Sequence, residues 1–171
     1  TISLPNSLEK IEWYCFGDCE SLSSITLPSS LTYIGGYAFE DCAALKSVII
    51  PEGVKTIEMH TFEDCTSLSN VTLPNGLTDI NWYAFSNCKA LKSIIIPNTV
   101  TSIGTGAFEN CNSIQSVIIP KSVTRVEEEA FNAKIKNIYC EAESIPWGWN
   151  AEFWNYSYIT NVIWGYVPEE S

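Results

Sequence analysis

The sequence has few basic residues, one histidine and one methionine. Its 171 residues include 9 lysines and arginines against 20 aspartates and glutamates, so the formal net charge is −11. An acidic surface repels phosphate backbones, which argues against nucleic acid as a partner. The single histidine, His60, excludes a histidine-rich metal site and leaves any histidine-based catalysis dependent on one residue.

Long apolar runs are also missing. No stretch approaches the roughly 20 residues that a helix needs to cross a bilayer, so we expect no membrane insertion. The sequence shows no initiator methionine and no signal peptide, and it begins abruptly at Thr1. We therefore expect a trimmed piece of a longer protein, with further repeats upstream. Hydrophobic residues are nevertheless 46% of the chain, which is too many for a disordered one.

A short repeat of constant length dominates the sequence. One unit reads L-P-x-x-(L/V)-x-x-I-x-x-x-A-F-x-x-C-x-x-L-x-x-(I/V)-x-(L/I)-P. The phenylalanine column comprises Phe16, Phe39, Phe62, Phe85, Phe108 and Phe131. The cysteine column keeps the same period and comprises Cys19, Cys42, Cys65, Cys88 and Cys111. A unit this short cannot bury its apolar face alone, so the copies must stack into a solenoid with one continuous core.

Each unit predicts short strands and one turn. Residues 45–51 alternate in polarity and end at proline, which indicates a strand with Val48 and Ile50 inward and Ile49 outward. Residues 31–34 predict a second extended pass. Residues 37–42 place apolar side chains at i, i+3 and i+4 spacing, which predicts a short helical turn. The expected fold is therefore an α/β solenoid of short parallel strands and short helical turns.

The repeat weakens after Phe131, where the apolar positions come two residues early. We assign residues 1–137 to the repeats and 138–171 to a C-terminal cap and tail. The cap segment is rich in aromatic residues, for which two interpretations stay open: a lid on the solenoid core, which we favour, or a platform that stacks on sugars. The residues concerned are Trp147, Trp149, Phe153, Trp154, Tyr156, Tyr158 and Trp164.

The repeat unit, with its A-F-x-x-C-x-x-L core, resembles the BspA-like leucine-rich repeat family and its Treponema pallidum-type repeats. The resemblance covers Ile2 to Phe131, and the segments 138–143 and 162–165 resemble the family's terminal region. It implies a right-handed, horseshoe-like leucine-rich-repeat solenoid in a bacterial protein that is secreted or on the cell surface. It also implies adhesion to a host matrix protein or another cell-surface protein, and it brings no catalytic motif.

The cysteines and acidic residues favour structural roles. The cysteine column occupies one inward position, so we predict buried, reduced thiols rather than disulfides. Cys15 and Cys19 have the spacing of one half of a zinc site but lack a second pair, so we expect no metal and no cofactor. A column of acids and amides precedes the cysteines and is typical of turns. It comprises Asp18, Asp41, Asp64, Asn87 and Asn110.

Two neighbouring variable columns form the candidate site, which we call the aromatic edge. They lie outside the core columns, and a row of exposed aromatic side chains often marks a binding surface. The alternative is that the rings lie flat over adjacent rungs and seal the turns. The aromatic edge comprises Trp13, Tyr14, Tyr37, Met59, His60, Trp82 and Tyr83.

The repeat and the aromatic edge predict a non-enzymatic binding module, and the family resemblance implies adhesion and a location outside the cell or on its surface. A purely structural spacer and a carbohydrate-binding module that uses the exposed aromatic rings are the alternatives. A second candidate surface is the outward column of the strands, whose β-favouring residues are ordinary for a sheet. That column comprises Ser3, Thr26, Ile49, Thr72, Ile95 and Ile118.

Overall fold

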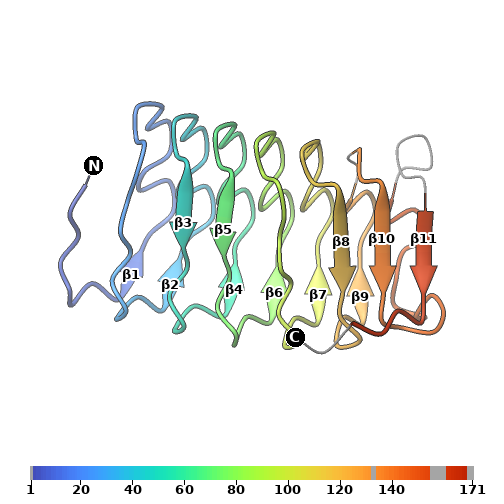
Figure 1. Cartoon of the computed structure of the whole chain (residues 1–171). Coiled ribbons are helices and arrows are strands. Elements are labelled where there is room, and N and C mark those ends of the chain that lie inside the picture. The colour runs from blue at the N-terminus through green and yellow to red at the C-terminus, as the bar shows by residue number, and fades with distance from the viewer. Residues whose placement is uncertain (1, 132–133, 155–160, 169–171) are drawn as a thin grey trace.

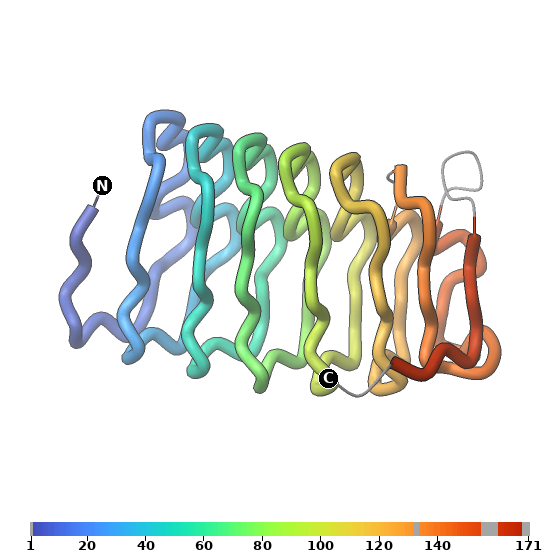
Figure 2. The backbone as a smooth tube through the Cα atoms, in the orientation of Figure 1, coloured from blue at the N-terminus to red at the C-terminus, as the bar shows by residue number. Residues whose placement is uncertain are grey.

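The chain folds into a solenoid in which each repeat makes one turn around a shared core. The computed structural model describes residues 2–131, 134–154 and 161–168. Figure 1 and Figure 2 show the rungs side by side in one row. The strands in these residues are β1 (Lys10–Ile11), β2 (Tyr33–Ile34), β3 (Ser47–Ile49), β4 (Thr56–Ile57), β5 (Asn70–Thr72), β6 (Asp79–Ile80), β7 (Ser102–Ile103), β8 (Ser116–Ile119), β9 (Arg125–Val126), β10 (Asn137–Cys140) and β11 (Asn161–Trp164).

The paired strands of the described residues run parallel and form two faces. The front face in Figure 1 carries the pair β3–β5 and the sheet β8–β10–β11. The back face carries β1–β2 and β4–β6–β7–β9. The register follows the sequence period, so that Ile80 lies between Ile57 and Ile103. The front-face segment Ser93–Ile96 pairs with neither β5 nor β8, which divides that face into two sheets.

The core follows the alternation that the sequence predicts. Val48 and Ile50 are 3% and 2% exposed, whereas Ile49 between them is 70% exposed. The phenylalanine rings form a continuous stack along the solenoid, with centroids of successive rings 5.3 to 5.5 Å apart. From Phe39 to Phe131 these rings are fully buried. Stacking of identical columns is therefore what turns the short repeat into one apolar core.

The thiols of the cysteine column are free, as predicted, and they are buried except at Cys19, which is half-buried. All seven cysteines are free, and the column members from Cys42 to Cys111 are fully buried. Each of these thiols donates a hydrogen bond to a phenylalanine carbonyl of the preceding rung, as Cys65 does to Phe39 at 3.1 Å. Burial raises the pKa of the Cys42 and Cys111 thiols to about 12. They therefore act as small hydrophobic residues and are poor nucleophiles.

The predicted helical turn is wrong, and with it the α/β class. The described residues contain strands and turns but no helix, so none of them forms a helix that could cross a membrane. In the turn over residues 37–42, Tyr37 and Asp41 have φ of 59° and 53°. Two left-handed residues four apart interrupt the backbone path of an α-helix. The acid and amide column occupies the second of these positions, because Asp and Asn tolerate that conformation best.

The amides of this turn alternate between two partners. Ala38 and Glu40 donate to carbonyls three residues back, as in consecutive tight turns. Tyr37, Phe39 and Asp41 instead donate to the next rung, to the carbonyls of Met59, Thr61 and Glu63 at 2.9 to 3.0 Å. Each turn is thus bonded both to itself and to its neighbour, which leaves no role for an α-helical bond pattern.

The last rungs keep the sheet while changing the repeat length. Ile138 of β10 lies opposite Val117 of β8, and Val162 of β11 lies opposite Ile138. The chain segment from Val117 to Ile138 is shorter than one repeat, and the segment from Ile138 to Val162 is longer. The strand ladder on the front face nevertheless continues to Trp164.

Aromatic side chains pack together at this end of the core. Trp149 and Phe153 are buried, with ring centroids 4.9 Å apart in an edge-to-face arrangement. The indole N–H of Trp149 donates to the carbonyl of Val123 at 3.1 Å, and the Trp164 ring lies 5.7 Å from it. Trp147 points into solvent and does not share this packing. Tyr156 and Tyr158 lie outside the described residues.

We predict that Phe62→Ala lowers the free energy of unfolding by about 3–5 kcal/mol, because it opens a cavity in the middle of the ring stack. Urea denaturation followed by circular dichroism measures this change. Ile49→Ala, at an exposed strand position, is the control and should cost well under about 1 kcal/mol. A loss below about 1 kcal/mol for Phe62→Ala would contradict the assignment of the phenylalanine column to the core.

Candidate functional site

The aromatic edge begins with an unusual backbone conformation. Tyr14, Tyr37, His60 and Tyr83 have φ between 54° and 59°, in the left-handed region that bulky residues seldom adopt. This conformation directs each side chain along the solenoid toward the equivalent position of the next rung. The four residues therefore form a row at the first left-handed position of each turn, which we call the aromatic ladder.

The rings of the aromatic ladder stack face to face. The centroids of Tyr14 and Tyr37 are 4.5 Å apart, those of Tyr37 and His60 4.4 Å, and those of His60 and Tyr83 5.1 Å. The planes of adjacent rings differ by no more than 22°. Such contacts contribute roughly 0.5–1.5 kcal/mol each beyond area burial, which offsets the strained backbone beneath them.

The aromatic ladder ends where the sequence changes at the same column. Gly106 follows Tyr83 with φ of 60°, and the Tyr83 ring occupies the space that a side chain on Gly106 would need. Glu129 follows in the next rung with φ of 52°. The stacked row therefore covers four rungs and is closed at its C-terminal end by one ring lying over a glycine.

The two tryptophans of the edge flank the ladder without touching each other. The Trp13 indole N–H donates to the Tyr33 hydroxyl at 2.9 Å, and its ring lies over Gly36 of the next rung. Trp82 lies three units further along, over Gly104. Trp13 is 46% exposed and Trp82 54% exposed, so both keep a large surface in solvent. The two indole rings therefore cover neighbouring rungs and also remain accessible.

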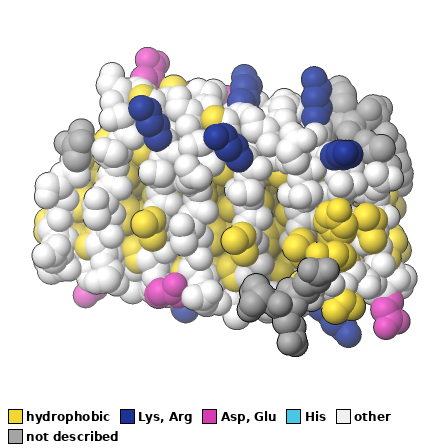
Figure 3. Space-filling view, in the orientation of Figure 1, with side chains coloured by type: hydrophobic (Ala, Val, Ile, Leu, Met, Phe, Trp, Pro, Cys, Tyr) yellow, Lys and Arg dark blue, Asp and Glu magenta, His cyan; other side chains and the backbone are white. Residues whose placement is uncertain are grey.

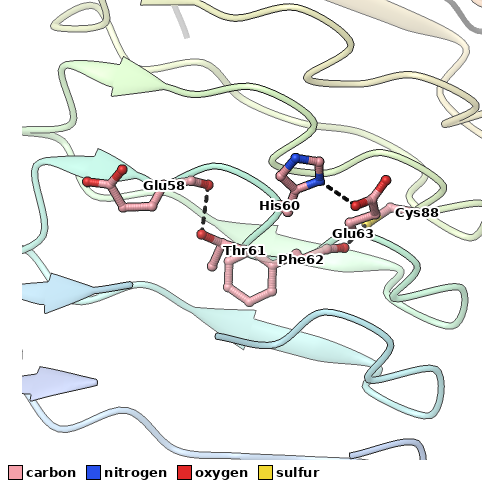
Figure 4. Close-up of polar contacts among 6 residues, drawn as sticks. All are labelled: Glu58, His60, Thr61, Phe62, Glu63 and Cys88. Carbon is pink, nitrogen blue, oxygen red and sulfur yellow. Dashed lines mark hydrogen bonds and ion pairs between the residues drawn. The ribbon is translucent and has the colours of Figure 1, made fainter. Parts of the chain in front are cut away.

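His60 is held by an acidic neighbour on its own turn. Its Nδ1 lies 2.5 Å from a carboxylate oxygen of Glu63, and both side chains are mostly buried. Figure 4 shows this contact beside the hydroxyl of Thr61, which donates to the carbonyl of Glu58 at 2.7 Å. Glu63 and Tyr33 were not among the predicted site residues. The spacing of Glu63, three residues after His60, is the signal that would have identified it.

Carboxylates line the turns next to the aromatic ladder. Burial, together with the nearby carboxylate of Glu63, raises the pKa of Glu40. Burial and the charge of Asp64 raise the pKa of Asp41 in the same way. Burial, followed by repulsion from Glu129, raises the pKa of Glu109. The aromatic edge therefore lies beside a row of negative charge that favours cationic groups in any partner.

Met59 completes the edge and borders a shallow hollow. The Met59 side chain is half-buried. Its rung lies between the rungs that carry Trp13 and Trp82. The hollow holds about 290 Å³ and is lined by Met59, Asn81, Trp82, Thr105, Arg125 and Glu127. In the described residues no group of three or more metal-ligating side chains comes together. What this geometry can do is make apolar and polar contacts along a rigid, elongated surface.

Comparison with known proteins agrees with this architecture. The sequence matches the BspA type leucine rich repeat region in six copies, over residues 1–98 and 78–165. The chain belongs to this family. No curated protein sequence matches this BspA-type chain closely enough to count as a relative.

Solved structures with the same fold come from several bacteria. The T. pallidum leucine-rich repeat protein is 26% identical with a TM-score of 0.72, covering 88% of this chain and 78% of its own. A leucine rich cell surface protein from Faecalibacterium prausnitzii is 27% identical with a TM-score of 0.74, covering 93% of this chain. The chain spans 46% of that protein's length. The pneumococcal vaccine antigen PcpA, at 19% identity and a TM-score of 0.69, shares the fold and covers 97% of this chain and 44% of its own.

We predict that Tyr37→Leu lowers the free energy of unfolding by about 1–3 kcal/mol, because it removes two ring stacks at once. Tyr14→Leu is the matched control, since it removes a single ladder stack while keeping a side chain on a left-handed residue. Urea denaturation compares the two variants. If Tyr37→Leu costs no more than Tyr14→Leu, the additional stack of Tyr37 on His60 contributes nothing to stability.

The raised pKa values of Glu40, Asp41 and Glu109 predict a pH dependence of stability. The folded chain holds these protons more tightly than the unfolded chain, so their stabilising effect is complete below the unfolded pKa of roughly 4. It is lost as the pH rises through the folded values. The thermal midpoint should therefore increase as the pH falls from about 7 toward 5.

Two substitutions test the origin of this effect. Glu40→Gln should reduce the difference between the midpoints at the two pH values, because it removes one of the responsible groups. Glu143→Gln changes an exposed carboxylate far from the aromatic edge and should leave the difference as it is. Equal effects of the two substitutions would show that Glu40 and the carboxylates beside the aromatic ladder do not cause the pH dependence.

Proposed function

We propose that this chain is a non-enzymatic module for protein binding or adhesion, secreted or on the surface of a bacterial cell, and that its aromatic edge contacts the partner. The proposal joins the family membership to the geometry of one surface. The Faecalibacterium relative bears the name of a cell surface protein, which supports the location. The partner class that follows is a host matrix protein or another cell-surface protein.

The exposed, prearranged aromatic surface is the observation that carries the proposal. Trp13, Tyr14 and Trp82 are 46%, 56% and 54% exposed and stand on rungs that are fixed to one another by backbone hydrogen bonds. Tryptophan and tyrosine contribute most to binding at protein interfaces. Rings that are already immobilised lose little conformational entropy when a partner binds.

The proposed division of the chain assigns different tasks to its two parts. Residues 1–137 form the rungs that present the aromatic edge. The segment 138–171 contributes the aromatic cluster around Trp149 and Phe153, which covers the apolar core. Closing the core prevents the open end of the solenoid from associating with other apolar surfaces.

Two alternatives each rest on a specific observation. The stacked aromatic ladder supports a structural spacer, because stacked rings stiffen the solenoid whether or not a partner binds. The fully exposed ring of Trp147, together with Trp13 and Trp82, supports binding to sugars by ring stacking. The experiment below separates these functions from protein binding.

The test is binding of the purified chain to an array of host matrix proteins and glycans. We expect a protein ligand whose binding falls at least about tenfold in the double variant Trp13→Ala, Trp82→Ala, because the loss of even one hot-spot tryptophan costs about 2 kcal/mol or more. Trp147→Ala is the control, since it removes an indole that is even more exposed and lies outside the aromatic edge. Surface plasmon resonance measures the affinities of the parent chain and of these variants.

The remaining outcomes point to the alternatives. A glycan ligand, with binding lost on removal of the tryptophans, would replace protein binding by carbohydrate recognition. No ligand from a folded sample, as judged by circular dichroism, would favour the spacer. A protein ligand whose affinity the double variant leaves unchanged would contradict the assignment of the site to the aromatic edge.

A further inference from the structure

The front face of the solenoid carries a second row of exposed apolar side chains. Ile49 and Ile95 are 70% and 84% exposed on rungs that lie two apart. Towards the C-terminal end the row continues through Ile118, the half-buried Tyr139 and Ile163, which are adjacent in the strand register. Exposed isoleucines in line on a sheet are a surface that favours apolar contact.

A hollow opens beside the most exposed of these isoleucines. Between β5 and the unpaired segment Ser93–Ile96 lies a depression of about 250 Å³. It is lined by Val71, Thr72, Leu73, Asn75, Ile95 and Pro97. A depression of this size and lining accepts one aliphatic side chain of a partner.

Basic residues gather along one margin of the same face. Five of the nine basic residues lie where the chain enters the front-face strands or in the turns just before them. Figure 3 shows Lys and Arg side chains along the upper margin of this face, above the apolar ones. All five are exposed, and we call them the lysine row: Lys46, Lys89, Lys92, Lys134 and Lys136.

Within the described part of the chain, no acidic side chain forms an ion pair with these lysines. The ion pairs among the described residues are His60–Glu63 and Arg125–Glu127, and neither involves the lysine row. In a chain with a net charge of −11, a row of unpaired positive charges is a local exception. The exception attracts anionic groups while the rest of the surface repels them.

We propose that the front face binds an extended, acidic segment of another polypeptide. Its carboxylates lie along the lysine row and its apolar side chains lie on the isoleucine row, one of them in the hollow beside Ile95. Lys46 with Ile49 and Lys92 with Ile95 repeat this pair of contacts two rungs apart, a step that spans about 9.6 Å where the strands are paired. A polyproline II segment presents every third residue at about 9.3 Å, which matches that spacing.

This surface is separate from the aromatic edge. The aromatic edge follows the strands of the back face, whereas the lysine row precedes the strands of the front face. The inference therefore adds a second contact of opposite charge to the proposed binding module, and it does not depend on the partner of the aromatic edge. A variant of one surface should leave binding at the other unchanged.

The test uses a fluorescent peptide of about five Glu-Val-Pro repeats, which combines the acidic, apolar and extended features. We expect saturable binding by fluorescence anisotropy that weakens as the salt concentration rises. The double variant Lys46→Glu, Lys92→Glu should weaken it at least about tenfold, and Ile95→Ser about fivefold. Lys55→Glu, before a back-face strand, is the matched control and should change the affinity less than about twofold.

Two further ligands identify the chemistry of recognition. A Lys-Val-Pro peptide of equal length should not bind, and binding as tight as that of the acidic peptide would overturn the role of charge. Polygalacturonate tests an anionic glycan, and tighter, lysine-dependent binding of that polymer would overturn the commitment to a polypeptide. No binding of the acidic peptide up to about 1 mM would overturn the proposal itself.

Discussion

Hydrogen bonds between the turns of successive rungs are the constraint on which this structure depends. In each full turn, every second amide donates to a carbonyl of the next rung, as Tyr37, Phe39 and Asp41 do to Met59, Thr61 and Glu63. These bonds hold equivalent positions at a constant separation and so align the columns of the repeat. The ring stack of the core, the thiol contacts and the aromatic ladder all follow from that alignment.

Columns of the repeat whose side chains do not form the core are free to vary, and the two candidate surfaces are built from these columns. The aromatic ladder uses the first left-handed position of each turn, where Tyr and His rings stack and carboxylates lie nearby. The lysine row uses the entrance to the front-face strands. One rigid frame therefore presents an acidic aromatic surface on one side and a basic apolar surface on another.

The core columns and the direction of Val48, Ile49 and Ile50 could be predicted, because period and polarity alone determine them. The helical turn was predicted wrongly, since i, i+3 and i+4 spacing also fits two consecutive tight turns. The Asp and Asn column contained the correct signal, because these residues favour positive φ. The seven residues of the aromatic edge stay a prediction as a binding site. That their rings lie over adjacent rungs was one of the two interpretations, whereas the positive φ of residues such as Tyr37, on which the face-to-face stacking depends, was not predicted. The loss of pairing at Ser93–Ile96 follows from no pattern, because its sequence alternates like that of β3.

The bonds between rungs have an evolutionary consequence because most of them join backbone atoms. A recombination event that removes or duplicates one complete unit leaves every amide with an equivalent carbonyl, whatever the side chains are. Insertion of one residue into a turn would instead shift donors away from acceptors. The shortened step to β10 and the lengthened step to β11 fall between strands and leave the pairing of β8, β10 and β11 in register. Proteins of this kind can therefore change length in whole repeats while their exposed columns diverge independently.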